Sequence, residues 1–296
     1  MRRLAPFALL LATVIWGWTF VLVKEGMGLV GPFVFLALRF LLATAVLTAL
    51  FGRALVRIRG RSIGRGALAG LALFAGYLFQ TWGLVTTSAT KSGLLTGLSV
   101  VLVPFLSAAI VRQRVRPVHW AGAVLAAGGL ATFVLAKGGV SSFNRGDLLT
   151  LVGAAAFATH LLLVDRFVRR DDYRVLLLVQ VAVVAALSVG GALAFERMPP
   201  TWPAKLVEGV VITGLLATAL SFYLMNRFQE HSTATYTAIL FTMEPVFAGL
   251  FGFLLLGETL TWLQGAGGLV ILAGMLLVPL VERVARRPPR GEPGRG

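Results

Sequence analysis

Three ionisable side chains stand inside long apolar stretches of this sequence: Glu244, His160 and Arg39. Charged groups are costly in apolar surroundings, and those that are retained usually face a water-filled cavity or a partner. Glu244 shares one side of a helix with Tyr236 and other apolar and aromatic residues at helical spacing. A carboxylate among aromatic surfaces suits a solute with an amine or a ring. The alternative is a structural carboxylate bonded to a neighbouring helix.

His160 and Arg39 each allow two interpretations. An imidazole could bind a solute or carry a coupling proton, because histidine titrates near neutral pH. It could equally be a hydrogen-bonded packing residue. A guanidinium could bind a solute carboxylate as a two-pronged donor, or it could lock helices together through an acidic or carbonyl partner.

The elements that carry these residues are predicted to be transmembrane helices. Apolar residues make up 57% of the chain, charged residues only 13%, and the mean hydropathy is +0.86, which is typical of a membrane protein. A helix needs roughly 20 apolar residues to cross a membrane. Ten such stretches are predicted, at 4–23, 32–51, 66–85, 92–111, 118–136, 147–164, 173–195, 206–228, 235–256 and 262–281. We expect an all-α integral membrane fold without room for a soluble domain.

The second half of the chain repeats features of the first half. Ser-Ala-Thr at 88–90 and Thr-Ala-Thr at 233–235 both open an apolar helix, and they lie 145 positions apart. The same shift relates a glycine pair at 122 and 129 to one at 267 and 274, which predicts close packing or a homodimer contact. These matches predict two five-helix repeats, 1–137 and 146–282, followed by a basic tail at 283–296 that we expect to be disordered. Five helices are an odd number, so the second repeat is predicted to be inverted.

Basic residues predict the orientation of the chain. With the N-terminus in the cytoplasm, 20 lysines and arginines lie in cytoplasmic segments and 6 in outer segments, with Arg39 inside a helix. This asymmetry predicts a protein of the cytoplasmic (inner) membrane with both termini in the cytoplasm. The net charge of +15 is then explained by contact with membrane lipids, and no nucleic-acid partner is expected.

Polar groups at matching depths in the two repeats predict a binding site between them. A shift of 141 pairs His160 with Thr19, and Phe157 with Trp16. The third and eighth predicted helices each add a tyrosine and an amide, although such residues also form ordinary hydrogen bonds between helices. The predicted substrate-binding residues are Glu244, Tyr236, His160, Trp16, Thr19, Tyr77, Gln80, Tyr223, Asn226 and Arg39.

Several short motifs resemble the EamA-type domain of the drug/metabolite transporter superfamily. They are MEPVFA at 243–248, LGE at 256–258, WG at 16–17 and LRFLL at 38–42, together with the two helix openings at 88–90 and 233–235. The resemblance spans nearly the whole chain as two tandem EamA domains. It implies a ten-helix carrier of small organic solutes, and many such carriers export amino acids, metabolites or drugs.

These observations favour a secondary transporter that moves a small organic solute by alternating access, in the export direction. The coupling ion stays open, with a proton as one candidate. No catalytic residues, cofactor or metal is expected, because cysteine is absent and the three histidines lie in different segments. The alternatives are an integral-membrane enzyme, a lipid translocator and a non-transporting scaffold.

Overall fold

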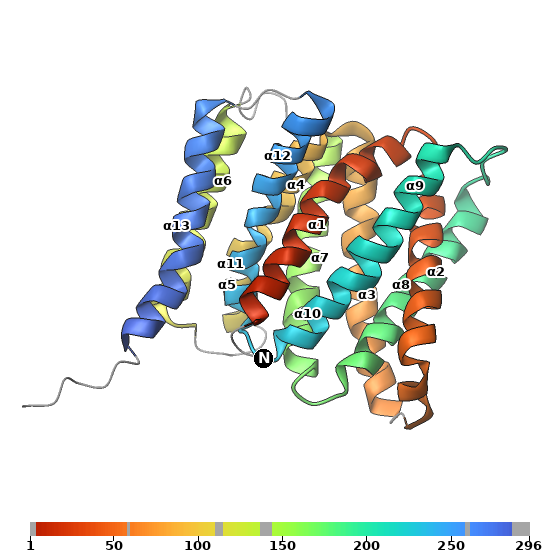
Figure 1. Ribbon diagram of the computed structural model, residues 1–296, viewed down its shortest axis with the longest axis horizontal. Coiled ribbons are helices and arrows are strands. Elements are labelled where there is room, and N and C mark those ends of the chain that lie inside the picture. Colours follow the sequence, from red (N-terminus) through yellow and green to blue (C-terminus); the bar gives the residue numbers. More distant parts are fainter. Residues whose placement is uncertain (1–3, 58–59, 110–114, 137–143, 258–260, 286–296) are drawn as a thin grey trace, which may run out of the picture.

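The described parts of the chain form a bundle of long helices (Figure 1). The computed structural model describes residues 4–57, 60–109, 115–136, 144–257 and 261–285. The helices are α1 (Ala5–Gly26), α2 (Pro32–Phe51), η1 (Gly52–Arg57), α3 (Gly60–Thr86), α4 (Ala89–Gly97), α5 (Ser99–Ala109), α6 (Pro117–Ala136), α7 (Arg145–Phe167), α8 (Tyr173–Phe195), α9 (Ala204–Ile212), η3 (Thr213–Leu220), α10 (Ser221–Gln229), α11 (Ala234–Phe241), α12 (Met243–Leu256) and α13 (Trp262–Ala285). They make ten passes along the bundle, which confirms the predicted all-helical architecture. Within the described residues, eight stretches are long and apolar enough to cross a membrane.

Three of the ten passes consist of more than one helix. The fourth pass is α4 followed by α5, and the ninth is α11 followed by α12. The eighth pass is α9, the π-helical segment η3 and α10. Irregular backbone inside a membrane protein is tolerated where it lies against other protein or lines a cavity.

The two divided passes, α4/α5 and α11/α12, match each other at the shift of 145 seen in the sequence. Ser88 accepts a hydrogen bond from the backbone of Lys91 at the start of α4, and Thr233 accepts the same bond from Tyr236 at the start of α11. Such side-chain caps satisfy free N–H groups at a helix start. The interruptions fall within one residue of the same correspondence, at Leu98 in one repeat and at Thr242 in the other. The repeat seen in the sequence is therefore a repeat of local structure.

Helix α3 joins the two repeats by packing between α7 and α8 of the second repeat. Its glycines allow this close approach. A Cβ on Gly70 would lie 3.0 Å from the backbone of Gln180 in α8, and a Cβ on Gly83 would lie 2.7 Å from the carbonyl oxygen of Gly146 in α7. Because distances below 3.0 Å are not tolerated, larger residues at the tightest of these positions would push the helices apart. The two repeats are thus interleaved.

Helices α6 and α13 form a pair at one side of the bundle, drawn at the left in Figure 1. A Cβ on Gly129 would lie 2.6 Å from the carbonyl oxygen of Gly267, and a Cβ on Gly274 would lie 2.8 Å from that of Gly122. The glycine pairs predicted for close packing or a homodimer contact therefore hold α6 against α13 within one chain. A homodimer stays a prediction that would need another surface.

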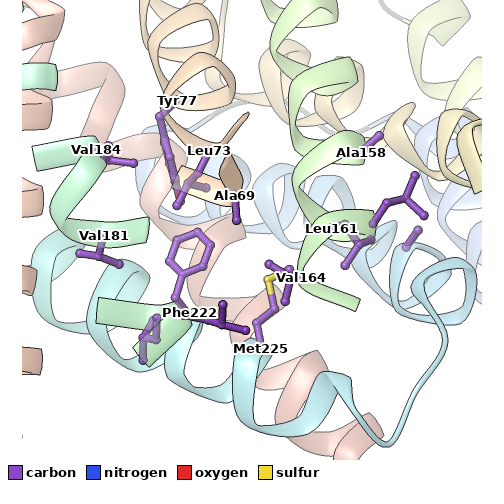
Figure 2. Close-up of a cluster of buried hydrophobic side chains, with 14 of the residues drawn as sticks. Ala69, Leu73, Tyr77, Ala158, Leu161, Val164, Val181, Val184, Phe222 and Met225 are labelled. Carbon is purple, nitrogen blue, oxygen red and sulfur yellow. The ribbon is translucent and has the colours of Figure 1, made fainter. Parts of the chain in front are cut away.

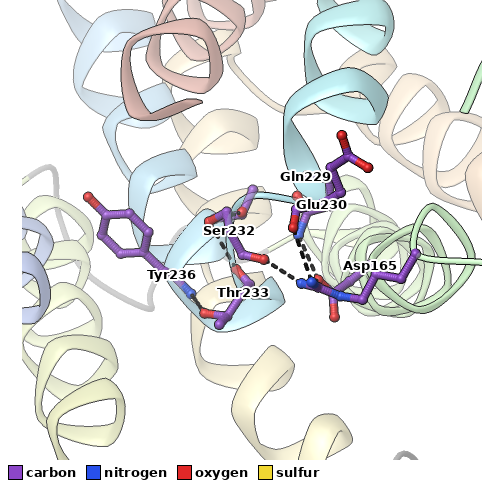
Figure 3. A network of polar contacts seen from close by, with 8 residues as sticks. Asp165, Gln229, Glu230, Ser232, Thr233 and Tyr236 are labelled. Atoms are coloured by element: carbon purple, nitrogen blue, oxygen red, sulfur yellow. Dashed lines mark hydrogen bonds and ion pairs between the residues drawn. The ribbon is translucent and has the colours of Figure 1, made fainter. Parts of the chain in front are cut away.

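Polar residues tie α7 to its neighbours at both of its ends. At the start of α7, Asp147 forms an ion pair of 2.6 Å with Lys91 and accepts a hydrogen bond of 2.6 Å from Thr87. At the other end, Arg169 binds Asp165 at 2.9 Å and donates to the carbonyl oxygen of Ser232 at 2.6 Å. Figure 3 shows this second network between α7 and the turn that precedes α11. These contacts fix the turns before both divided passes.

The described chain begins and ends at the same end of the bundle, since α1 starts and α13 finishes there (Figure 1). This agrees with an even number of passes. The predicted disordered tail at 283–296 lies mostly outside the described residues, which end at position 285. The last residue of the LGE motif at 256–258 lies outside them as well.

Candidate functional site

A cavity lies inside the bundle and is lined by both repeats. It contains about 750 Å³ of space not filled by protein atoms, part of it open to solvent. The lining residues come from α1, α2, α3, α4 and α5 in the first repeat and from α7, α10, α11 and α12 in the second. Neither α6 nor α13 contributes a described residue to the lining.

Glu244 reaches the cavity from the first turn of α12, directly after the interruption at Thr242. Pro245 explains part of this interruption, because proline has no N–H to donate to the preceding turn. The start of a helix also favours a negative charge. Among the described residues, the carboxylate has no hydrogen-bond or ion-pair partner. Glu244 is therefore a carboxylate held at a helix start and open to the cavity.

Arg39 lies on the cavity wall on α2 and is only 3% exposed. Its Nε donates a hydrogen bond of 2.7 Å to Thr218 in η3, and one Nη donates a bond of 3.2 Å to the Tyr77 hydroxyl. The guanidinium carbon also lies 4.6 Å from the centre of the Tyr77 ring. No carboxylate within the described part of the chain pairs with Arg39. Its partners lock α2 to the neighbouring helices but leave its charge uncompensated.

Aromatic rings form much of the remaining wall. Trp16 packs against Phe222 and Phe241, with ring centres 5.5 and 5.0 Å apart, and its Nε1 donates a hydrogen bond of 2.8 Å to the carbonyl oxygen of Ala217. Tyr77 meets Phe157 edge to face, with ring centres 5.1 Å apart. Figure 2 shows Tyr77 and Phe222 as members of a cluster of buried hydrophobic side chains.

His160 is 2% exposed and begins a chain of three buried side chains. Its Nε2 lies 2.6 Å from Oε1 of Gln180 in α8, and Nε2 of Gln180 donates a hydrogen bond of 3.0 Å to Oδ1 of Asn226 in α10. Nδ2 of Asn226 then donates a bond of 2.9 Å to the backbone carbonyl oxygen of Phe222. His160 lines the cavity, whereas Gln180 and Asn226 lie behind it, fully buried.

The structure brings most of the predicted site residues together around this cavity. Those that line it are Glu244, His160, Trp16, Thr19, Tyr77, Gln80 and Arg39. The hydroxyl of Thr19 donates to the carbonyl oxygen of Trp16 at 3.0 Å. Gln80 donates a hydrogen bond of 2.9 Å to Thr96 of α4, so it joins α3 to the divided fourth pass.

Three predicted residues lie outside the lining. Tyr223 stacks on Phe51 with ring centres 5.7 Å apart, and Asn226 belongs to the buried chain behind His160. Their places on the cavity wall are taken by Phe222 and Met225, each one position earlier. Tyr236 lies in the first turn of α11, and its ring points away from the polar network drawn in Figure 3.

Sequence reasoning did not identify several residues of the lining. Thr96, Gly97 and Ser99 come from the interruption between α4 and α5, and Ser99 corresponds to Glu244 at the shift of 145. Ser99 could have been identified, because the shift of 145 was already known from the helix openings and the glycine pairs. The π-helical segment η3 does not line the cavity, but sequence reasoning missed it too. The sequence gives only a weak indication of this segment: Thr213 and Thr218 are five residues apart, and the Thr218 hydroxyl donates to the Thr213 carbonyl oxygen at 2.9 Å.

Comparisons with known proteins agree with this architecture. The chain matches the EamA-like transporter family over residues 3–135 and 144–280. It is 31% identical over 279 residues to an uncharacterized transporter of Archaeoglobus fulgidus, which covers 94% of this chain and 87% of the relative. It is 25% identical over 303 residues to a probable amino-acid metabolite efflux pump of Salmonella typhimurium, with 97% and 98% coverage.

The fold is also found in a solved structure. It superposes with a TM-score of 0.79 at 23% sequence identity, and the match covers 97% of this chain and 100% of the other. The interleaved helices, the two sequence matches and the similarity to transporters over almost the full length lead to one assignment. The chain is a multi-pass membrane transporter and belongs to the EamA-like transporter family of the drug/metabolite transporter superfamily.

Proposed function

We propose that this transporter exports small zwitterionic organic solutes, which carry an amine and a carboxylate, by alternating access. The observation that carries the proposal is the presence of two opposite charges in one cavity. Arg39 and Glu244 both line the cavity, and neither has an ion-pair partner among the described residues. An uncompensated charge in a low-dielectric site is unfavourable, so a solute that supplies both counter-charges gains binding energy.

The surroundings of the two charges fit such a solute. Tyr77 lines the same cavity as Arg39 and Glu244, and the guanidinium carbon of Arg39 lies 4.6 Å from the centre of the Tyr77 ring. The carboxylate of Glu244 would bind an ammonium group, and the guanidinium of Arg39 would bind a carboxylate through its remaining N–H donors. The aromatic wall around Trp16 and Phe222 would take the apolar part of the solute.

Alternating access is supported by the two divided passes. In transporters with inverted repeats, solute sites form where interrupted helices meet at mid-membrane, and the repeats then rock around the site. Here α4 packs on α12, and α5 packs on α11. Ser99 begins α5, Glu244 lies in the first turn of α12, and both reach the cavity. Export follows the direction that is common in the family and the printed name of the Salmonella typhimurium relative.

The test is uptake from a pool of amino acids and other metabolites into proteoliposomes, read by mass spectrometry. We expect wild-type protein to accumulate zwitterionic solutes, and Glu244→Gln to reduce that accumulation at least about tenfold because the ammonium loses its counter-charge. Glu25→Gln is the matched control, since Glu25 lies at the end of α1, is solvent-exposed and pairs with Lys205 at 3.4 Å. Equal transport by wild-type and Glu244→Gln protein would contradict the assignment.

The same vesicles test proton coupling. Uptake with and without an imposed proton gradient separates coupled transport from facilitated diffusion. If Glu244 or His160 carries the coupling proton, Glu244→Gln or His160→Ala should remove the gradient dependence. If both variants transport as wild type does, neither residue belongs to the solute or proton site.

A further inference from the structure

We propose that His160 is a specificity-determining residue that accepts a hydrogen bond from the transported solute through Nδ1, and that Gln180 and Asn226 are positioning residues that fix its tautomer. The role toward the solute rests on the proposed function. The tautomer does not, because it follows from the hydrogen-bond chain alone.

The direction of the chain is set at its far end. The carbonyl oxygen of Phe222 can only accept, so Asn226 must turn its Nδ2 toward it, at 2.9 Å. Oδ1 of Asn226 then faces Gln180 and needs a donor, which is Nε2 of Gln180 at 3.0 Å. This leaves Oε1 of Gln180 as the atom 2.6 Å from His160. An amide oxygen can only accept, so Nε2 of His160 must carry a proton.

The same argument defines the other ring nitrogen. In a neutral imidazole with a proton on Nε2, Nδ1 has a lone pair and is an acceptor. His160 lines the cavity. Among the described residues, the imidazole ring forms one hydrogen bond, from Nε2 to Gln180. Nδ1 is not among the buried polar atoms without a partner, so it is open to the cavity space. A solute N–H or O–H can therefore reach it.

Burial makes this selection strict. Gln180 and Asn226 are 0% exposed, so water cannot replace a link of the chain and let the imidazole switch tautomer. The ring also meets Phe222 edge to face, with centres 5.8 Å apart, which restricts its rotation. A solute that presents an acceptor or a methyl group to Nδ1 leaves a lone pair without a partner in a largely buried site, and this is penalised.

The position of His160 indicates which part of the solute it selects. Arg39 and Glu244 account for the carboxylate and the amine, whereas the imidazole lies at the aromatic wall with Phe222. We therefore infer that the preferred zwitterions carry a hydrogen-bond donor on the side chain, such as a hydroxyl or a ring N–H. Side chains of the same shape whose donor is methylated are disfavoured.

The first arm of the test reads the tautomer directly. Purified protein is labelled with ¹⁵N-histidine, the ring nitrogens are observed by NMR, and His160 is assigned by the loss of its signals in His160→Gln. We expect a proton on Nε2 and a bare Nδ1 in wild type. In Gln180→Met we expect a mixture of both tautomers, because Nε2 loses its acceptor. Ser188→Ala is the matched control: Ser188 is a buried residue of the same helix outside the chain, and its spectrum should keep the wild-type tautomer.

The second arm reads selectivity. Proteoliposomes receive serine, threonine, tyrosine and tryptophan together with their O-methyl or ring-N-methyl derivatives. We expect wild type and Ser188→Ala to prefer the unmethylated partners about tenfold or more, and Gln180→Met to lose most of that preference while it still transports. In each variant, adding Glu244→Gln should still reduce transport, and this result shows that the variant protein is folded.

The outcomes separate the two proposals. A wild-type His160 with its proton on Nδ1, or on both nitrogens, overturns the acceptor role whatever the transport result. The expected tautomer with equal transport of methylated and unmethylated solutes also overturns it. If no amino acid in the pool is transported, the proposed function fails, and the selection of side-chain donors fails with it, while the tautomer result still judges the hydrogen-bond chain.

Discussion

Replacing Gly129 by alanine should destabilise the transporter, whereas the same change at its neighbour Gly128 should not. A Cβ on Gly129 would lie 2.6 Å from the carbonyl oxygen of Gly267 and 2.9 Å from the backbone nitrogen of Ile271. Ordinary contacts begin at 3.4 Å, so α13 would have to retreat by about 0.8 Å along one of these directions. A Cβ on Gly128 would meet nothing within 4 Å.

The magnitude follows from this difference. Overpacking against backbone that cannot rotate away costs about 1–3 kcal/mol. Gly128→Ala keeps the contact. Both substitutions remove chain freedom from the unfolded state, which stabilises each variant by about 0.4–1 kcal/mol and cancels when the two are compared. The two variants should thus differ by roughly 1–3 kcal/mol, or about 2 °C or more in apparent Tm for a protein of this size.

The assay is thermal unfolding of detergent-solubilised protein, followed by tryptophan fluorescence at one heating rate. Gly274→Ala adds a second test, since its Cβ would lie 2.8 Å from the carbonyl oxygen of Gly122 on the same interface. If Gly129→Ala moves α13 away, the double variant with Gly274→Ala should lose less than the sum of the single losses. Equal apparent Tm values for Gly128→Ala and Gly129→Ala would refute the described packing of α6 on α13.

Three further outcomes follow from polar contacts near the ends of the bundle. Lys91→Met should lower the stability of the protein by about 2 kcal/mol or more, because the Asp147 side chain, which is 0% exposed, loses its cation. Adding Asp147→Asn should recover much of this loss, and both changes are measured as apparent Tm. Burial would raise the pKa of Asp171, but hydrogen bonds from Ser62 and the Arg65 guanidinium outweigh it and hold the pKa below its ordinary value. Asp171 therefore stabilises fully above about pH 4 and loses this contribution as pH falls through its folded pKa. The Tm deficit of Asp171→Asn should thus be largest at neutral pH and should shrink as the pH is lowered below about 4. Glu196→Leu should lower the apparent Tm by several degrees, because the Glu196 carboxylate accepts hydrogen bonds of 3.1 and 2.8 Å from two N–H groups in the first turn of α2. An unchanged Tm would contradict this capping role.

Much of the fold could be predicted from the sequence because it depends on local patterns. Stretches of some 20 apolar residues mark the passes, and the hydroxyl residues Ser88 and Thr233 mark the starts of α4 and α11. The interruptions at Leu98 and Thr242 could not be predicted to the residue, because they depend on how α4, α5, α11 and α12 cross. The apolar helical pattern continues across both interruptions, so each divided pass was predicted as a single span.

The site was predicted less completely, for one clear reason. Most of the predicted residues project from regular helices, and their positions on the cavity wall follow from spacing. On the eighth pass, the wall contains Phe222 and Met225 instead of Tyr223 and Asn226, which is a displacement of one residue at each position. The π-helical segment η3 precedes them, and one additional residue in a turn rotates the following helix by about 100°. This change of register depends on tertiary contacts of Thr218 and Ala217, and apolar periodicity does not report it.

The interleaving of the repeats has a consequence for how the protein is made. Helix α3 is synthesised well before α7 and α8, yet its close contacts through Gly70 and Gly83 are with those two helices. The first half of a nascent chain therefore enters the membrane with its principal packing surface unoccupied, and it must wait for about a hundred further residues before that surface is covered. Neither half can complete its interior alone. Two separately translated halves should assemble only with each other, and a truncated first half should be a target for membrane quality control.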